Sequence, residues 1–432
     1  MQAMWIRGGR PLRGTWRVSG AKNAALKMMA ASLMATEKCV ITDVPGINDV
    51  LTMMGVMRHL GADVRLHPNG HLHIGPVTGD AWEAPEQLVR QMRASVLVMG
   101  PVLAKTGRVR IALPGGCAIG PRPIDLHLRG FRLMGADIVE ERGFVEARAS
   151  RLRGAEIQLD FPSVGATENL MMAATLAEGA TVIRNAAREP EIIDLQTFLN
   201  NMGAKVVGAG TDTIRIVGVD GLRGARHAVM PDRIEAGTAM VAAAITGGDI
   251  VVQNVITEHL EAVTAKLREA GVEVTPAGAS GLRVRGVARP RALYVRTQPH
   301  PGFPTDMQPQ FMSMAAVADG SSIIKETVYT SRMKHADELR RMGADIVVDG
   351  SVAVVRGVER LTGAVVEAPD LRAGAALILA GLAADGDTVV EGLEHIDRGY
   401  ELLDDKLRAV GAEVRRIAED SAVADGRPLV SV

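Results

Sequence analysis

Apolar and polar positions follow one another along this chain in a pattern that occurs six times. Each copy is a helical run that ends in glycine, followed by a short apolar residue, a charged residue and a branched apolar one. A glycine after a helical run is typical of a helix C-cap, and the branched residue is typical of the start of a strand. Successive glycines are 68 to 74 residues apart, which predicts six copies of one supersecondary unit. They are Gly61, Gly135, Gly203, Gly271, Gly343 and Gly411.

A second pattern defines the rest of each unit. Short β-branched runs such as "DIVVQN" (249–254) follow alanine- and methionine-rich segments such as "ATENLMMAATLAEG" (166–179), which favour a buried helix. After the capping glycine, segments such as "IVVDGSVAVV" (346–355) predict two strands joined by a tight turn. Each unit therefore reads strand, helix, strand, helix, strand, strand.

The two ends of the chain fit the same pattern. The opening residues 4–6 resemble the last strand of a unit, which the sixth copy lacks. We therefore expect the start and the end of the chain to meet. With three units per domain, one domain covers 22–230 and the second combines 1–21 with 231–432, the tail after about 418 being exposed.

Composition narrows the class of protein. The chain has 432 residues, 47% of them apolar, and a formal charge of −1, which argues against a basic face for nucleic acid. No start segment resembles a signal peptide and no apolar run is long enough for a bilayer, so we expect no membrane contact. Two cysteines favour the reducing cytoplasm. Metal-ligand spacings, phosphate loops and dinucleotide fingerprints are absent from the sequence, so neither a metal nor a cofactor is predicted.

Polar residues gather at one position of the unit, the loop between its first strand and first helix. Cations at a helix start are poor caps but, with the free backbone N–H groups, make an anion site. The alternative for Ser163, Thr167 and Asp232 is that they only cap helices. The loops carry Lys22, Asn23, Arg93, Asp232, Arg233, Asp306, Asp370 and Arg372.

The segment "LPGGCAIGPRPIDLHLRG" (113–130) is a second candidate. Its glycines and prolines predict a loop that carries the thiol of Cys117 near the cation of Arg122, a setting that favours a reactive thiolate. Cys39, inside a strand-like run, is expected to be a buried apolar residue. His127, His300 and His395 lie near these motifs, and a structural or orienting role is expected for each.

Seven motifs in order, from "SGAKNAAL" (19–26) through "PGGCAIGPRPIDLH" (114–127) to "HIDRGYELLDDKLRAVGAEV" (395–414), resemble the UDP-N-acetylglucosamine enolpyruvyl transferases. The resemblance covers residues 1 to about 417. It implies a two-domain inside-out α/β barrel with three βαβαββ repeats per domain and a site between domains that close on substrate. It also implies transfer of the enolpyruvyl group of phosphoenolpyruvate to the 3′-hydroxyl of UDP-N-acetylglucosamine, the first committed step of peptidoglycan synthesis.

The resemblance also implies roles for individual residues. Lys22 and Arg398, with Arg122, would hold the phosphate of phosphoenolpyruvate beside Cys117, the residue that the epoxide fosfomycin alkylates in the family. Asp306 would act as the base near the sugar hydroxyl. Arg332 and Arg372 would contact the carboxylate or the closing interface. The remaining substrate contacts implied are Asn23 and Val328 for the sugar, Arg93, Arg122, Pro123, Ile124, Asp125, Leu126, Ser163, Val164 and Gly165 for the diphosphate and uracil, and Asp370 and Leu371 beside Arg372.

Three residues depart from the family pattern as the resemblance gives it. Tyr329 and Ser331 stand where phenylalanine and asparagine are common, and Phe161 replaces a lysine-bearing segment. These changes would trim sugar contacts and remove one cation from the nucleotide pocket, without touching the reacting groups.

Three other functions stay open. A transferase acting on shikimate phosphate shares the fold, but its opening loop resembles "GSKS" rather than "GAKN". A transferase acting on another uridine nucleotide would share almost every motif. A non-catalytic nucleotide-binding protein is the alternative from another class, and the joint presence of Lys22, Cys117, Asp306 and Arg398 argues against it. The sequence does not fix the oligomeric state.

Overall fold

The computed structural model describes residues 2–113 and 124–418, which form two compact units. We call residues 20–113 and 124–230 the N-unit, and residues 2–19 and 231–418 the C-unit. The chain passes from one unit to the other at Ser19–Gly20 and returns at Met230–Pro231.

The N-unit contains three repeats. Its elements are α1 (Lys22–Ser32), β3 (Cys39–Thr42), α2 (Asn48–His59), β4 (Val64–Leu66) and β5 (Leu72–Ile74); then α3 (Glu86–Gln91), the 3-10 helix η1 (Arg93–Val98), α4 (Met99–Thr106), β6 (Arg108–Ala112), α5 (Asp125–Leu133), β7 (Asp137–Glu141) and β8 (Phe144–Arg148); then β9 (Glu156–Gln158), α6 (Val164–Ala174), β10 (Ala180–Arg184), α7 (Pro190–Asn201), β11 (Lys205–Val207), β12 (Thr213–Val217) and β13 (Arg226–Ala228).

The C-unit repeats the plan. Its elements are β1 (Gln2–Arg7), β2 (Arg13–Arg17), α8 (Arg233–Ile245), β14 (Asp249–Gln253), η2 (Thr257–Leu260), α9 (Glu261–Glu269), β15 (Glu273–Pro276) and β16 (Gly281–Arg285); then β17 (Tyr294–Arg296), η3 (Thr305–Met307), α10 (Gln308–Ala316), β18 (Ser321–Lys325), α11 (His335–Arg341), β19 (Asp345–Asp349) and β20 (Val352–Arg356); then β21 (Val365–Glu367), α12 (Leu371–Ala383), β22 (Asp387–Glu391), α13 (Leu393–Ile396), α14 (Leu403–Ala409) and β23 (Glu413–Ala418).

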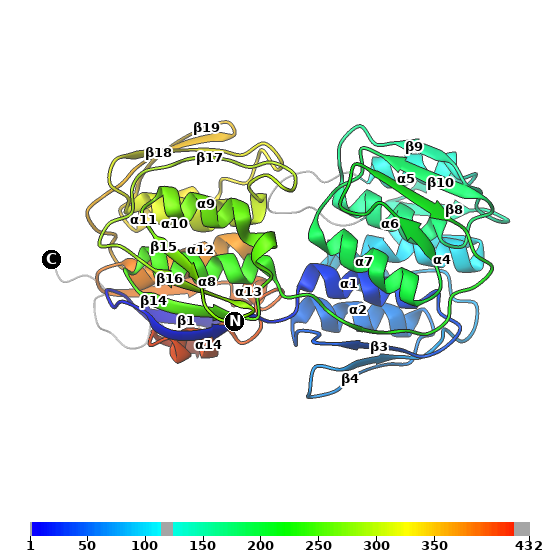
Figure 1. Cartoon of the computed structure of the whole chain (residues 1–432), viewed down its shortest axis with the longest axis horizontal. Coiled ribbons are helices and arrows are strands. Elements are labelled where there is room, and N and C mark those ends of the chain that lie inside the picture. The colour runs from blue at the N-terminus through cyan, green and yellow to red at the C-terminus, as the bar shows by residue number, and fades with distance from the viewer. Residues whose placement is uncertain (1, 114–123, 419–432) are drawn as a thin grey trace. The chain divides into compact units, whose positions relative to one another are not determined.

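The sheets lie outside and the most apolar helices lie inside each unit (Figure 1). In the C-unit α8, α10 and α12 pack against one another, and nearly every residue of α12 is buried. A helix that is apolar all round needs a protein environment on every side, whereas the sheets need only one covered face. The sequence pattern of alanine- and methionine-rich helices between alternating strands therefore accounts for this arrangement.

The predicted repeat is confirmed at its helix ends and hairpins, but among the described residues the second repeat lacks the predicted opening strand, and its sheet β6-β8-β7 has three strands where the others have four. All six capping glycines have the left-handed backbone expected of a helix C-cap, with φ between 89° and 102°. At Gly61 a side chain would also collide with the backbone, since a Cβ would lie 2.2 Å from the carbonyl oxygen of Thr78. The predicted hairpins β4–β5 and β19–β20 are both antiparallel pairs.

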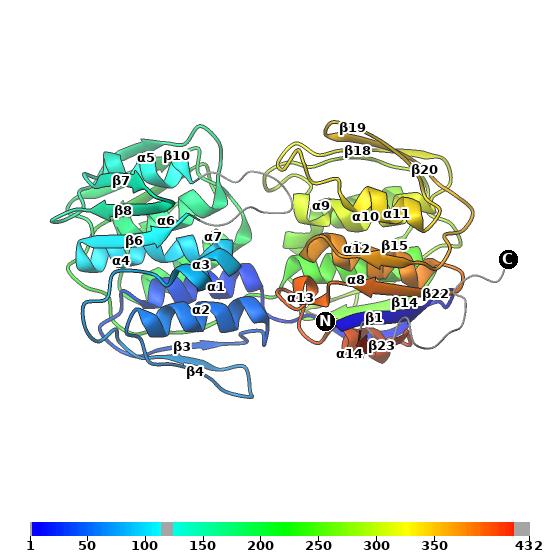
Figure 2. The same ribbon diagram turned by 180° about the vertical axis from the view of Figure 1, so that it is seen from behind.

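The first residues of the chain complete its last repeat, as predicted. Strand β1 lies between β22 and β23 and pairs with both, so that Met4 faces Val390 on one side and Arg416 on the other (Figure 2). The side chains of Met4 and Ile6 are fully buried. The amino end of the chain is thus an interior strand of a C-unit sheet.

The expected boundaries place residues 1–21 with the second domain and residues up to 230 with the first, but they do not say which strands pair at the two crossings. Strand β2 leads into α1 of the N-unit but pairs with β14 of the C-unit. Strand β13 leads into α8 of the C-unit but pairs with β3 of the N-unit. Two hydrogen bonds accompany the crossings, from Ala21 N to Met230 O at 2.7 Å and from Asp232 N to Ser19 O at 2.9 Å.

One predicted loop is wrong. Arg93 was expected in a loop before a helix, but it is the first residue of η1, which follows α3 after the single residue Met92. The apolar residues Val89, Met92, Val96 and Leu97 are buried here, and this burial favours helical structure over a loop.

Candidate functional site

In the C-unit the structure brings Asp306 together with two of the predicted arginines. Asp306 lies in η3, directly before α10, and its two oxygens accept hydrogen bonds from different side chains. Arg332 Nη1 donates to Oδ1 at 2.8 Å and Arg372 Nε donates to Oδ2 at 3.2 Å. The side chain of Asp306 is 25% exposed, whereas those of Arg332 and Arg372 are almost fully buried.

Both arginines remain strong cations in this buried place. Burial lowers the pKa of the Arg332 guanidinium, but the charges of Asp306 and Asp370 outweigh burial and its pKa is raised. Burial acts in the same direction on Arg372, whose pKa is nevertheless raised by Tyr400 and Asp306. Within the described residues, Arg332 Nε and Arg372 Nη1 are buried without a hydrogen-bond partner. The pair therefore keeps donors for a further anion.

Two other predicted residues sit beside this cluster. Asp370 caps α12, accepting from the backbone N–H of Arg372 at 2.9 Å and of Ala373 at 3.1 Å. Leu371 is the first residue of α12 and is half-buried. Val328 is half-buried in the segment after β18, and Arg398 is half-buried between α13 and α14.

Tyr400, which was not singled out from the sequence, stabilises Arg372 and is itself held by Thr238. Tyr400 is fully buried, and its ring lies 5.3 Å from the guanidinium carbon of Arg372. Its hydroxyl forms a hydrogen bond of 2.9 Å with Thr238 Oγ1. Burial raises the pKa of Tyr400, so the hydroxyl stays protonated. The aromatic face and the guanidinium form a cation–π contact that favours the charged arginine.

In the N-unit the predicted residues lie at the amino ends of two helices. Lys22 begins α1, and its ammonium group donates to Asp49 Oδ2 of α2 at 3.0 Å, with both side chains mostly buried. Asn23 follows in the first turn and is half-buried. Ser163 caps α6 by accepting from Ala166 N at 3.3 Å, and Val164 and Gly165 begin that helix.

A buried asparagine connects the other N-unit residues. Asn169 of α6 accepts from Gly100 N at 2.7 Å, donates to Val96 O at 2.9 Å, and contacts His127 Nδ1 at 3.0 Å. These bonds hold α6 against α4, α5 and the 3-10 helix that Arg93 begins. Burial, with the charge of Arg93, lowers the pKa of His127 to about 3, so His127 is neutral and orienting, as expected.

A buried ion pair joins α1 to α6. Lys27 Nζ lies 2.7 Å from Glu168 Oε1, and the two side chains are 7% and 0% exposed. Burial raises the pKa of Glu168 to about 7; Lys27 opposes the shift, and Glu191 and Glu189 add to it. Sequence reasoning missed this pair because nothing in spacing joins two residues 141 positions apart.

The remaining predicted residues lie outside the described residues, at helix starts or in the core. Cys117, Arg122 and Pro123 lie outside the described residues. Asp125 begins α5, with Ile124 just before it and Leu126 just after, and Ile124 is buried. Asp232 caps α8 by accepting from Ile234 N at 2.8 Å. Thr167 is not a cap, because it lies inside α6 and its hydroxyl accepts from Ala187 N at 3.1 Å. Cys39 is fully buried, and burial raises its pKa, as expected of an inert thiol.

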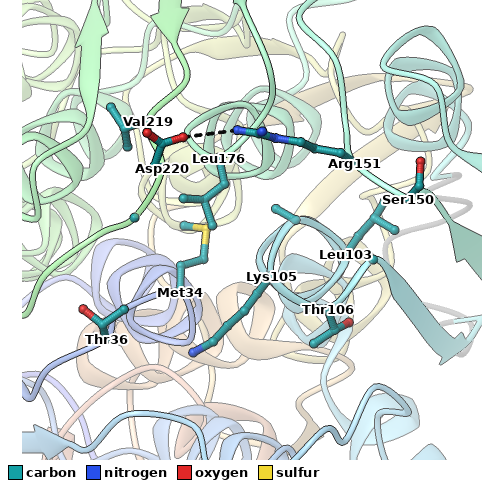
Figure 3. A pocket seen from close by; sticks show the side chains of 13 residues that line it. Met34, Thr36, Leu103, Lys105, Thr106, Ser150, Arg151, Leu176, Val219 and Asp220 are labelled. Atoms are coloured by element: carbon teal, nitrogen blue, oxygen red, sulfur yellow. Dashed lines mark hydrogen bonds and ion pairs between the residues drawn. The ribbon is translucent and has the colours of Figure 1, made fainter.

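A cavity of about 490 Å³ lies elsewhere in the N-unit (Figure 3). Its lining includes residues just beyond the carboxyl ends of α1, α4 and α6, whereas Lys22 and Ser163 lie at or next to the amino ends of α1 and α6. Lys105 donates to Leu33 O at 2.8 Å, and Arg151 pairs with Asp220 at 3.4 Å. Helix carboxyl ends carry partial negative charge, so this cavity is a poor place for a phosphate.

Comparisons with known proteins agree with this architecture. The family model of EPSP synthase (3-phosphoshikimate 1-carboxyvinyltransferase) matches residues 6–407. The chain is similar to the solved structure of the enolpyruvyl transferase NikO from Streptomyces tendae, with a TM-score of 0.87, 25% identity, and coverage of 96% of this chain and 98% of that one. It shares the fold of EPSP synthase from Acinetobacter baumannii, with a TM-score of 0.77, 21% identity, and coverage of 97% of this chain and all of that one.

Closer sequence relatives narrow the class. The chain is 56% identical to UDP-N-acetylglucosamine 1-carboxyvinyltransferase 1 of Caldanaerobacter subterraneus subsp. tengcongensis, covering 94% of this chain and 97% of the relative. It is 54% identical to the protein of the same name from Carboxydothermus hydrogenoformans, covering 96% of this chain and 99% of the relative.

The family match over residues 6–407 and the shared fold place the chain among the enolpyruvyl transferases of the EPSP synthase type. Within that class, the chain belongs to the family of UDP-N-acetylglucosamine 1-carboxyvinyltransferases.

The described residues contain neither a helix suited to a membrane nor a group of side chains suited to a metal ion. None of the helices in residues 2–113 and 124–418 is long and apolar enough to cross a membrane. In the same part of the chain, no three histidine, cysteine or acidic side chains are grouped as a metal site would require.

Proposed function

We propose that this protein transfers the enolpyruvyl group of phosphoenolpyruvate to the 3′-hydroxyl of UDP-N-acetylglucosamine and releases phosphate. The reaction would pass through a tetrahedral ketal and begin the synthesis of peptidoglycan. The observation that carries the proposal is the Asp306 carboxylate held between Arg332 and Arg372, in a chain more than half identical to enzymes of that name. We place the reaction in the cytoplasm, which the low cysteine content of the sequence favours.

The arginine pair suits the chemistry of phosphoenolpyruvate. That substrate carries a phosphate and a carboxylate, and a planar guanidinium binds a carboxylate through two parallel N–H groups. The buried donors Arg332 Nε and Arg372 Nη1 have no hydrogen-bond partner among the described residues, and a substrate anion that reached them would satisfy both. A carboxylate bound there would compete with Asp306 for the same guanidiniums.

That competition links substrate binding to the proposed base. In the structure both oxygens of Asp306 are engaged by arginine. A base must have a lone pair within hydrogen-bond reach of the proton it removes. We therefore propose that binding of the phosphoenolpyruvate carboxylate draws the guanidiniums away and frees one oxygen of Asp306 for the sugar hydroxyl.

The other proposed roles follow the predicted residues. Lys22 and Arg398, with Arg122, would hold the departing phosphate beside Cys117, which would deliver a proton to the methylene carbon. Asn23 and Val328 would hold the sugar. Arg93, Ser163 to Gly165, and the segment from Arg122 to Leu126 would take the diphosphate and uracil, and Asp370 and Leu371 would support Arg372. The amino ends of α1 and α6 favour such anions because their first N–H groups lack helical partners.

Phosphate release tests the proposal directly. Purified full-length protein is incubated with phosphoenolpyruvate and UDP-N-acetylglucosamine, together and separately, and inorganic phosphate is measured. Release is expected only when both are present. Parallel reactions with shikimate 3-phosphate and with UDP-N-acetylgalactosamine test the two related transferase activities. Folded protein that releases no phosphate from the first pair, or prefers another acceptor, would contradict the proposal.

A further inference from the structure

Glu326 lies at the end of a strand that every repeat contains, so the residue at this position can be compared across the six repeats. It is the first residue after β18. In four of the other repeats the corresponding residue has a left-handed backbone, with φ of 58°, 52°, 59° and 76°, and in the remaining one Leu113 stands there. Those four are Asp43, Asn185, Asn254 and Gly392. The backbone of Glu326 is not left-handed, so this repeat departs from the common turn.

The side chain of Glu326 replaces that turn by a set of hydrogen bonds. It is fully buried. Its Oε1 accepts from Thr297 Oγ1 at 2.7 Å and from the backbone N–H groups of Val328 at 2.8 Å and Tyr329 at 3.0 Å. Its Oε2 accepts from Thr305 Oγ1 at 2.9 Å. Four donors thus converge on one carboxylate.

None of these four donors is a cation. In the part of the chain that the structure describes, Glu326 forms no ion pair with lysine or arginine. A buried carboxylate without a counterion is costly even when it is well hydrogen-bonded. At the corresponding position of another repeat the shorter side chain of Asn254 forms a single hydrogen bond, to Val18 O at 2.8 Å. Forming the turn alone does not require a glutamate.

One of the four donors connects Glu326 to the candidate catalytic cluster. The Thr305 hydroxyl gives its only hydrogen to Glu326, so its lone pairs are left to accept. Arg332 Nη1 donates to Thr305 Oγ1 at 3.0 Å and to Asp306 Oδ1 at 2.8 Å. The direction of the Thr305 hydroxyl, set by Glu326, therefore fixes where the Arg332 guanidinium meets Asp306.

We propose that Glu326 is a positioning residue for the enolpyruvyl transfer, an inference that rests on the function proposed above. Glu326 orients Thr305, which orients Arg332 against Asp306. Through the N–H groups of Val328 and Tyr329 it also shapes the backbone that would face the sugar. It touches neither substrate and acts through these neighbours.

The test combines three variants and one matched control. Glu326→Gln keeps one accepting oxygen but turns an N–H₂ group toward Thr305 or toward the two backbone N–H groups. Thr305→Val removes the link to Arg332 at nearly constant volume. The third variant combines the two changes. The control is Asn254→Gly, which removes the side-chain bond at the corresponding position of the same unit and tolerates the left-handed backbone.

The expected result is a split between catalysis and stability. Glu326→Gln and Thr305→Val each lower kcat by about 10- to 100-fold, because a displaced reacting group costs that much. The double variant loses little more than either single one, since both changes break the same connection. The KM for UDP-N-acetylglucosamine rises in Glu326→Gln and in the double variant, but not in Thr305→Val. Asn254→Gly shifts the urea midpoint but leaves kcat within about twofold.

Two results would overturn the inference alone, provided that the wild-type protein releases phosphate. One is a kcat of Glu326→Gln within about twofold of wild type. The other is a double variant whose losses multiply, which would show independent effects. Wild-type protein without any phosphate release would instead overturn the proposed function together with this inference.

Discussion

The contacts of Asp306 make its charge hard to replace. Its two partners are almost fully buried, at 6% and 3% exposure of their side chains. Removing one member of a buried ion pair leaves an uncompensated charge, which costs several kcal/mol. The same carboxylate is the proposed base, so stability and turnover depend on one side chain.

Asp306→Asn should therefore damage both properties. We expect loss of turnover by about 100-fold or more, because the proposed base is removed, and destabilisation by about 3 kcal/mol. Phosphate release and urea denaturation measure the two effects. The matched control is Asp249→Asn on β14, where Asp249 also accepts from two arginines, Arg283 and Arg285, whose side chains are 43% and 46% exposed. That change should cost about 1 kcal/mol or less and leave turnover intact; equal effects at the two sites would contradict this account.

At the scale of elements, the helices of the N-unit are joined by polar contacts as well as by apolar packing. The Lys27–Glu168 pair connects α1 to α6, and Asn169 connects α6 to α4 and α5. Glu168 and Asn169 follow directly after the first turn of α6, the turn that Ser163 caps. These contacts fix the relative places of the helix starts that carry Lys22 and Ser163.

The Glu168 carboxyl gives the stability of the protein a pH dependence of known sign. Its folded-state pKa of about 7 lies above the ordinary value of 4.5, so the folded state holds the proton more tightly. Stability should therefore fall as the pH rises from about 4.5 to 7, by on the order of 3 kcal/mol. The Lys27→Met, Glu168→Gln double variant lacks this titration. Urea denaturation at pH 5 and pH 8 should show wild type losing stability relative to the double variant, and a difference independent of pH would refute the shift.

The sequence predicted elements well where a local rule applied. Gly203, with φ of 102°, and the other capping glycines were found because only a left-handed residue ends a helix in this way. Strand β1 was assigned to the last repeat because its pattern matched the missing strand. Side-chain pairs such as Arg372–Asp306, 66 residues apart, could not be predicted from spacing, since they depend on how α12 packs against α10.

A comparison of corresponding positions in the six repeats would have singled out Glu326, which the spacing of the motifs did not. Glu326 stands where other repeats have Asp43, Asn185 or Asn254, and that difference is visible in the printed sequence. What the sequence alone does not reveal is the number of donors that meet there, because Thr297 and Thr305 come from other parts of the repeat. The expected domain boundaries assigned the segments of β2 and β13 to the units in which they pair. Their partners β14 and β3 could not be predicted, because either pairing satisfies the same alternating pattern.

At the scale of the whole molecule, the two units differ in how their chain segments are distributed. Every strand that pairs in the N-unit sheets lies within residues 20–230. The C-unit needs two strands from the start of the chain, because β1 fills the gap between β22 and β23 and β2 covers the edge of β14. The strands of the N-unit therefore come from one stretch of the sequence, whereas those of the C-unit come from two.

Fragments of the chain should reflect this difference. A fragment of residues 20–230 should fold by itself and unfold cooperatively in urea. A fragment of residues 231–418 should not, because its sheets would have open apolar edges. Gln2 lies opposite Ala418 in an antiparallel pair, so residues 2–19 can be joined after 418 through a short hairpin turn.

That permuted fragment, 231–418 followed by 2–19, should recover a cooperative transition by circular dichroism. Cooperative unfolding of 231–418 without the added strands would contradict the requirement for β1 and β2. Failure of the 20–230 fragment to fold would show instead that the N-unit depends on contacts that its own sheets do not supply.

The exchange of strands also affects how the protein is made. A ribosome delivers the amino end first, and domains generally fold as they emerge. The N-unit has all its strands once β13 is out, but β1 and β2 must wait, unpaired, until β14, β22 and β23 have been translated. Strand edges left open in this way invite wrong pairing with other chains. Strands β1 and β2 thus leave the ribosome well before the partners with which they pair.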